Sequence, residues 1–175
     1  VDYRLGQLLA DLGEQARIIV TADHGMEAKS RGLDFNRLFD AAGLDCEAVP
    51  IIKDKHVIHH NNMGGAIYIW CHDGQIDRVS DLLLAEQGVT EVLSREAACA
   101  RFGLMPERIG DLMVLGDEQT VFGLLPATRV SLKNLRSHGG PTESKVPFYA
   151  WNLPVQPGAV DYSYQAVHLL GLMTD

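Results

Sequence analysis

The sequence lacks several features that would assign it to a specialised class of protein. No apolar run approaches the roughly 20 residues that span a bilayer, and no basic segment leads into an apolar one as in a secretory signal. Lys and Arg number 15 against 23 Asp and Glu, which gives a formal charge of −8, and they form no cluster. Because nucleic-acid binders concentrate basic residues, we expect neither a nucleic-acid partner nor a membrane partner.

Cysteine is also scarce. The three cysteines, Cys46, Cys71 and Cys99, are widely spaced and form no short pair typical of a zinc knuckle or a redox motif. We expect them to be reduced residues that pack in the interior of a cytoplasmic protein. The chain begins with Val1 and not with methionine, which predicts that these 175 residues are a piece of a longer protein.

What is present near the start of the chain is a short apolar strand between two amphipathic helices. Leucines recur at helical spacing across residues 2–12, and residues 18–21 are apolar or β-branched, which predicts a helix and then a buried strand. After a polar stretch at residues 27–32, Asp34 is expected to cap a second helix over residues 35–42. Helix, strand and helix in this order are typical of doubly wound α/β folds.

The pattern changes between residues 45 and 123, where short apolar segments alternate with two helical patterns, over residues 76–86 and 94–102. The predicted strands are EAVPII, KHVIHH, GAIYIWC, VTEVL, DLMVLG and TVFG. We expect this region to form a small α+β subdomain with its own core. The expected core residues are Ile67, Ile69, Val79, Leu82 and Val92.

The last part of the chain contains a polar segment, a strand and a helix. Residues 124–145 are polar and include a Gly-Gly-Pro run, which predicts an active-site loop. The segment VPFYAW, residues 146–151, predicts a buried strand. Apolar residues at helical spacing from Ala166 to Met173 predict a closing helix.

The segment TADHGM, residues 21–26, places a carboxylate and an imidazole at the end of the first strand, where open α/β sheets bind ligands. Neighbouring strand residues point to opposite faces, so Asp23 and His24 can serve one site only if the chain turns, and Gly25 permits such a turn. A carboxylate and an imidazole that converge make half of a zinc-like site. The tripeptide Ala22-Asp23-His24 alone favours a capping Asp and a surface His over a metal site, because short motifs match by chance.

A second segment, SHGGPTESKVPFYAW at residues 137–151, reverses this and favours the metal site. With TADHGM it resembles the alkaline phosphatase superfamily, in which the first motif gives two ligands to one metal and a later HG or HGG gives one to the other. The stretches RSHGGPTESKVPF, HVIHHNNMGGAIYIW and IGDLMVLGD most resemble the phosphonoacetate hydrolases and their relatives among the type I phosphodiesterases and nucleotide pyrophosphatases.

The resemblance covers nearly the whole chain and implies an alkaline-phosphatase-like α/β fold. This chain would hold the C-terminal portion of a doubly wound sheet, with an inserted small α+β lobe. Residues 1–44 and 124–175 would belong to the metal-binding core. Residues 45–123 would form the lobe, which in relatives covers the metal site and closes on the substrate.

The resemblance also implies two divalent metal ions, zinc by analogy, about 4 Å apart. Asp23 and His24 are expected to bind the metal on the side of the nucleophile, and His138 is expected to bind its partner. The Thr or Ser nucleophile and the remaining ligands of relatives precede the segment that matches Val1. We therefore expect the catalytic nucleophile upstream of this chain, and the 175 residues alone to be inactive.

Two further sets of residues have two interpretations each. Phosphonoacetate hydrolases carry a pair similar to His59 and His60, so one of these could face a substrate carboxylate or phosphonate, but either could equally end a strand. Near His138, Glu143 could orient the ligand and Arg136 could clamp a phosphoryl group, or both could be solvated loop charges.

The function implied by the resemblance is two-metal hydrolysis of a small phosphonate or phosphate ester, with phosphonoacetate, cleaved to acetate and phosphate, as the leading substrate. The alternatives are a nucleotide pyrophosphatase or phosphodiesterase, and a non-catalytic metal-binding remnant. A phosphoglycerate-mutase-like isomerase shares the metal site, but the HGGPTE segment resembles the hydrolases more. The expected partner is a small phosphorus-containing substrate, and a homodimer is compatible with the sequence, which does not specify the oligomeric state.

Overall fold

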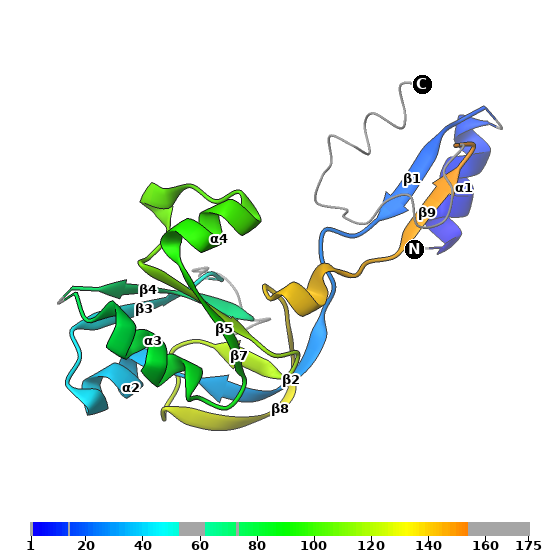
Figure 1. Cartoon of the computed structure of the whole chain (residues 1–175). Coiled ribbons are helices and arrows are strands. Elements are labelled where there is room, and N and C mark those ends of the chain that lie inside the picture. Colours follow the sequence, from blue (N-terminus) through cyan, green and yellow to red (C-terminus); the bar gives the residue numbers. More distant parts are fainter. Residues whose placement is uncertain (1, 14, 53–61, 73, 154–175) are drawn as a thin grey trace. The chain divides into compact units, whose positions relative to one another are not determined.

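The computed structural model describes residues 2–13, 15–52, 62–72 and 74–153 (Figure 1). The chain divides into two compact units. The split unit comprises Val1–Gly25 and Ser144–Asp175, and the continuous unit comprises Met26–Glu143. None of the helices within the described ranges is both long enough and apolar enough to cross a membrane.

The split unit pairs two strands from opposite ends of the chain beside one helix. Helix α1 (Asp2–Leu12) ends where Gly13 takes a positive φ of 79°, so the predicted first helix is confirmed. Strand β1 (Ile18–Thr21) runs antiparallel to β9 (Phe148–Trp151). A groove of about 550 Å³ is lined mainly by apolar side chains of these three elements.

Neither strand of this pair is buried, although the sequence predicted burial of both. All four residues of β1 are partly exposed, and Tyr149 and Trp151 of β9 are 67% and 53% exposed. Within the described part of the chain, β1 and β9 pair only with each other, and α1 contributes no buried residue. A two-stranded ribbon cannot enclose its own apolar side chains, so these remain in contact with water.

The continuous unit contains two open sheets. Strands β3 (Cys46–Pro50), β4 (Ala66–Cys71), β6 (Leu112–Gly116) and β5 (Val89–Ser94) form an antiparallel sheet in the order β3-β4-β6-β5. In the second sheet, β2 (Glu27–Leu33) lies between β7 (Thr120–Phe122), which is parallel to it, and β8 (Arg129–Ser137), which is antiparallel. The helices are α2 (Phe35–Ala42), α3 (Ile76–Leu84) and α4 (Arg95–Phe102), with 3-10 turns η1 (Pro106–Arg108) and η2 (Pro141–Ser144).

Helices cover both faces of the four-stranded sheet (Figure 1). On one face, Ile67 and Ile69 of β4 pack with side chains of α2 and α3. On the other face, Met113 of β6 packs with Ala98 of α4. Burial on both faces explains why β6 is apolar and buried along its whole length.

The structure confirms most of the elements predicted between residues 45 and 123. Five of the six expected strands are present as β3 to β7, and both expected helices are present as α3 and α4. The predicted core is confirmed too: Ile67, Ile69 and Val79 are buried, and Leu82 and Val92 pack against them. The sixth predicted strand, KHVIHH, and the closing helix after residue 160 lie outside the described residues.

Two segments that the sequence predicted to be loops are strands. Residues 27–32, expected to be a polar connection, form most of β2, and residues 129–137, within the expected active-site loop, form β8. Lys29 of β2 is buried although it is charged, because it pairs with an acid far away in sequence. A half-buried strand is recognised by alternating apolar and polar residues. In β2, charged residues occupy inward positions, so this alternation is absent from the sequence.

The continuous unit is larger than the lobe predicted at residues 45–123. Phe35 and Phe39 of α2 pack in the same core as β4 and α3, and β2 pairs with β7 and β8. Residues 26–44 and 124–143 therefore group with the lobe. The doubly wound arrangement, the metal-binding core and the role of the lobe as a cap stay predictions.

The cap of α2 has a second role in the continuous unit. As predicted, Asp34 is the N-cap, with its Oδ1 accepting from the N–H of Arg37 (3.3 Å), and Gly43 ends the helix with a φ of 64°. The Oδ2 atom of Asp34 also accepts a hydrogen bond of 2.8 Å from the N–H of Leu125. This carboxylate, only 3% exposed, thus joins α2 to the segment that leads into β8.

We expect Asp34→Ala to lower the free energy of unfolding by about 2–3 kcal/mol, because it removes the cap and leaves the N–H of Leu125 without its acceptor. Ser94→Ala is the matched control, since Ser94 caps α4 through one bond, from the N–H of Ala97. Its loss should be about 1 kcal/mol. Equilibrium urea unfolding measures both, and equal losses would contradict the joining role of Asp34.

Candidate metal centre

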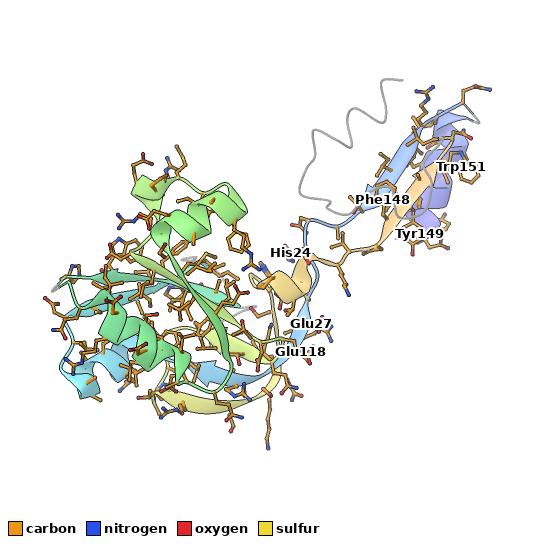
Figure 2. The ribbon with its side chains drawn as sticks, viewed as in Figure 1. His24, Glu27, Glu118, Phe148, Tyr149 and Trp151 are labelled. Atoms are coloured by element: carbon orange, nitrogen blue, oxygen red, sulfur yellow. The ribbon has the colours of Figure 1, made fainter. Side chains whose placement is uncertain are left out.

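Asp23 and His24 follow the C-terminal end of a strand, as predicted, but within the described residues this strand, β1, pairs only with β9 and is not the central strand of a larger sheet. Figure 2 shows His24 at this position. The chain bends at Asp23, so these two side chains are released from the alternation of the strand. Gly25 was expected to supply this turn through its conformational freedom, but Gly25 has no positive φ. The bend therefore does not depend on a backbone conformation that only glycine adopts.

The two side chains converge. The Nε2 atom of His24 lies 3.5 Å from Oδ2 of Asp23, and the backbone N–H of His24 donates to Oδ1 of Asp23 over 3.0 Å. The Nδ1 atom of His24 lies 2.9 Å from the carbonyl oxygen of Gly25. A carbonyl only accepts, so the hydrogen is on Nδ1, and in the neutral ring the lone pair is on Nε2, next to the carboxylate.

This pair of donor atoms fits a metal ion. A tetrahedral zinc ion with bonds of about 2.0–2.1 Å holds its donor atoms about 3.3 Å apart, close to the observed separation. Histidines that bind metals usually donate their other ring N–H to a carbonyl or carboxylate, as His24 does to Gly25. The Asp23 side chain is 86% exposed and that of His24 is 37% exposed, so an ion can reach both.

His138 lies in the continuous unit, directly after β8. Its carbonyl oxygen accepts a hydrogen bond of 2.9 Å from the N–H of Gly65. The hydroxyl of the preceding residue, Ser137, donates to the carbonyl of Met63, and Ser137 is fully buried. The segment Met63-Gly64-Gly65 therefore lies beside the backbone of Ser137 and His138 and is hydrogen-bonded to both residues.

Two glycines bring the backbones of these segments into direct contact. A Cβ atom on Gly65 would lie 2.7 Å from the nitrogen and 2.9 Å from the Cα of Gly140. Real Cβ atoms do not approach other atoms so closely, so a side chain at position 65 would push the His138 segment away. Gly139, which lies between His138 and Gly140 in the chain, has a φ of 97°, a value that favours glycine.

Glu143 is buried, with a side chain only 1% exposed. One carboxylate oxygen accepts a hydrogen bond from the ammonium group of Lys29, and the other accepts one of 2.8 Å from the N–H of Gly140. Of the two interpretations left open by the sequence, a solvated loop charge is therefore wrong. Through the N–H of Gly140, Glu143 is bonded to the backbone two residues after His138.

The turn between β6 and β7 is held by Asp117. Its carboxylate accepts hydrogen bonds from the hydroxyl of Thr120 (2.6 Å), the guanidinium of Arg31 (3.0 Å) and the N–H of Gln119 (3.0 Å). Partial burial by itself would raise the pKa of this carboxyl, but these three donors outweigh burial and lower the pKa. The same turn carries Glu118 (Figure 2).

The predicted ligands belong to different units, with Asp23 and His24 in the split unit and His138 in the continuous unit, and the metal-to-metal spacing stays a prediction. Within the described ranges, no group of three or more His, Cys, Asp or Glu side chains could hold a metal ion. His59 and His60 lie outside the described residues. Arg136 donates to the carbonyl of Met26 over 2.9 Å, and its suggested role as a phosphoryl clamp stays a prediction.

Sequence reasoning missed Lys29 and the contact of Gly65 with Gly140. Lys29 lies in the stretch that was expected to be a loop, where a lysine is normally solvated. The only local signal was the alternation of Glu27, Lys29 and Arg31, which places three charged residues on one face of a strand.

Comparison with known proteins assigns the family. Residues 1–140 match the family of type I phosphodiesterases and nucleotide pyrophosphatases. A phosphonoacetate hydrolase from Sinorhizobium meliloti, solved in complex with phosphonoacetate and with phosphonoformate, is 34% identical, with a TM-score of 0.81. The match covers 98% of this chain and 44% of that protein.

Two more distant relatives share the fold. The murine and human ectonucleotide pyrophosphatase/phosphodiesterase 5 are 24% and 22% identical, with TM-scores of 0.54 and 0.53. These matches cover 85% of this chain and 38% of each relative. The chain thus spans less than half the length of the relatives it matches. The extent of the family match and the similarity to the hydrolase show that the chain belongs to the type I phosphodiesterase/nucleotide pyrophosphatase family of the alkaline phosphatase superfamily.

Proposed function

We propose that the full-length protein hydrolyses a small phosphonate or phosphate ester with the help of two divalent metal ions, and that phosphonoacetate is its substrate. One observation carries this proposal. Across 98% of its length the chain is 34% identical to an enzyme that was solved in complex with phosphonoacetate. Hydrolysis would break the carbon–phosphorus bond and give acetate and phosphate.

In this proposal, Asp23 and His24 hold one metal ion and His138 holds the other. The approach of Nε2 of His24 to Oδ2 of Asp23, and the bond from Nδ1 to the Gly25 carbonyl, support the first assignment. When bound, two such ions neutralise charge on the phosphoryl oxygens and activate the nucleophile. The chain's own residues supply the donor atoms and fix their direction. The nucleophile and the remaining ligands are proposed to lie in the upstream part of the protein.

Hydrolysis of a nucleotide pyrophosphate or phosphodiester is the second candidate. The match of residues 1–140 to a family named for these activities favours it. The two candidates share the metal chemistry and differ in the group that the protein must accommodate beside the phosphorus atom. A third outcome, a protein that binds metal without turnover, is distinguished by the same experiments.

We expect Asp23→Ala and His138→Ala each to lower kcat/KM of the full-length protein for phosphonoacetate by about 100-fold or more, because each removes a proposed ligand of an ion that stabilises the transition state. Release of phosphate measures turnover, and each variant should also bind less zinc. His72→Ala is the matched control, since His72 is an exposed histidine just after β4. It should leave the rate unchanged.

The same assay decides between the candidates. A full-length enzyme that prefers a nitrophenyl phosphodiester over phosphonoacetate would promote the second candidate. Zinc binding with no turnover of either substrate would establish the remnant. Full activity in His138→Ala would contradict the proposed role of His138.

We expect Gly65→Ala to lower kcat/KM by about 10- to 100-fold, because the new methyl group would displace the Gly140 backbone and with it the His138 segment. Gly6→Ala is the control, because among the described residues, apart from the adjoining residues and the backbone of α1 itself, no atom lies within 4 Å of the added methyl group. Since alanine favours a helix interior, this control should be neutral or stabilising by up to about 1 kcal/mol. Phosphate release and thermal unfolding are measured for both variants, and an unchanged rate in Gly65→Ala would contradict the expected displacement.

The 175-residue chain by itself should not hydrolyse phosphonoacetate or a nitrophenyl phosphodiester. Asp23 and His24 give two ligands to one ion and His138 gives one to the other, and such open sites hold divalent ions weakly against water. The test is a zinc-supplemented assay of the 175-residue chain beside the full-length protein. Zinc-dependent turnover by the shorter chain would show that it contains a complete site.

A further inference from the structure

Lys29 of β2 and Glu143 of η2 form an ion pair in the interior of the continuous unit. Their side chains are 0% and 1% exposed, and the two residues are 114 positions apart in sequence. Removing two charges from water is unfavourable unless the geometry is good and their remaining donors and acceptors are also paired. The other hydrogen-bond partners of Lys29 and Glu143 therefore indicate the structural role of the pair.

Both groups bond backbone atoms of other segments. The ammonium group of Lys29 also donates to the carbonyl of Glu118, in the turn between β6 and β7, over 2.9 Å. The second oxygen of Glu143 accepts from the N–H of Gly140 over 2.8 Å. Through these bonds the pair connects β2, the β6–β7 turn and the segment that follows His138.

The His138 segment is thus held on two sides. On one side, the N–H of Gly65 bonds the carbonyl of His138, and Gly65 packs directly on Gly140. On the other side, Glu143 bonds the N–H of Gly140, two residues after His138. Gly139 lies between these fixed points and has little backbone stiffness of its own. Without the carboxylate of Glu143, one of the two attachments is lost.

We propose that the Lys29–Glu143 pair is a positioning device: it fixes the backbone from His138 to Gly140 and thereby the direction of the His138 imidazole. This inference rests on the proposed function, in which His138 is a metal ligand. A role in stability alone would not require charges, because well-packed apolar side chains can replace a buried ion pair without loss of stability. What apolar side chains cannot replace is the acceptor for the Gly140 N–H.

The experiment compares two double variants of the full-length protein that differ in this acceptor. Lys29→Met/Glu143→Leu removes both charges and the acceptor, whereas Lys29→Met/Glu143→Gln removes the charges and keeps an amide oxygen for the N–H of Gly140. The matched control is Arg129→Met/Glu86→Leu, which removes another ion pair of the same unit, away from His138. Each protein is freed of metal and titrated with zinc against a chelator, and its thermal unfolding is recorded.

We expect Lys29→Met/Glu143→Leu to bind the second equivalent of zinc about 10- to 100-fold more weakly, the range seen when groups that orient a ligand are removed. Its lost activity should return when excess zinc is added, which a purely structural defect would not allow. Lys29→Met/Glu143→Gln should recover most of the zinc affinity, and the Arg129/Glu86 control should keep all of it. If the leucine variant does not fold, Glu143→Asp, which keeps the charge but withdraws it by one methylene, should show a smaller loss of affinity.

His138→Ala, in the same titration, distinguishes the proposed ligand role of His138 from the proposed positioning role of the Lys29–Glu143 pair. Loss of one zinc equivalent in His138→Ala, together with unchanged zinc affinity in the folded leucine variant or in Glu143→Asp, would overturn the positioning role and leave the proposed function intact. Retention of both zinc equivalents in His138→Ala would overturn the ligand role of His138, and the positioning role would fall with it. Equal affinity losses in the leucine and glutamine variants would also overturn it, because the acceptor would then make no difference.

Discussion

A pair of glycines, Gly64 and Gly65, joins the two sheets of the continuous unit to the segment that carries His138. Gly64 exchanges two backbone hydrogen bonds with Phe122 of β7, while Gly65 accepts one from Gly116 at the end of β6 and donates one to the carbonyl of His138. Backbones can approach this closely only where no side chain intervenes, and a Cβ at position 65 would overlap with the facing chain. The placement of His138 in its unit therefore depends on the absence of a side chain as much as on any bond.

The parts of the fold that could be predicted are those in which local pattern and burial agree. β4 and β6 are apolar on both faces because helices cover both faces of their sheet, and such runs are recognisable without knowledge of the partners. β2 and β8 could not be recognised in this way. Lys29 and Arg31 occupy β2, and their acidic partners are 114 and 86 residues away, so only tertiary structure converts a polar pattern into a strand. For β9 the opposite error occurred: its apolar sequence predicted a buried strand, but the strand is largely exposed. Composition indicates which side chains a strand can bury, but not whether another element covers them.

In the candidate metal centre, too, some features follow from the local sequence and others depend on tertiary contacts. The position of Asp23 and His24 at a strand end follows from the sequence, because an apolar run that stops at an acid and an imidazole is a local signal. The bend at Asp23 and the bond from the His24 ring to the Gly25 carbonyl are not local signals, and they decide which ring nitrogen faces the carboxylate. His138 was proposed as a ligand only through resemblance, and its role stays a prediction. The burial of Glu143 could not be foreseen, because its partner Lys29 lies in a stretch that looked like a loop.

The donor atoms themselves bear on which metal the site prefers. Magnesium demands octahedral geometry with bonds of about 2.0–2.1 Å, which sets neighbouring donors about 2.9 Å apart, and it favours oxygen ligands. Zinc accepts imidazole nitrogen as readily as carboxylate oxygen, and its tetrahedral geometry sets donors about 3.3 Å apart. The Nε2 of His24 and the Oδ2 of Asp23 are 3.5 Å apart, nearer the second value, and the ring is oriented by a carbonyl in the manner of zinc-binding histidines. These donor atoms are therefore compatible with the zinc ion expected by analogy, and the identity of the metal stays a prediction.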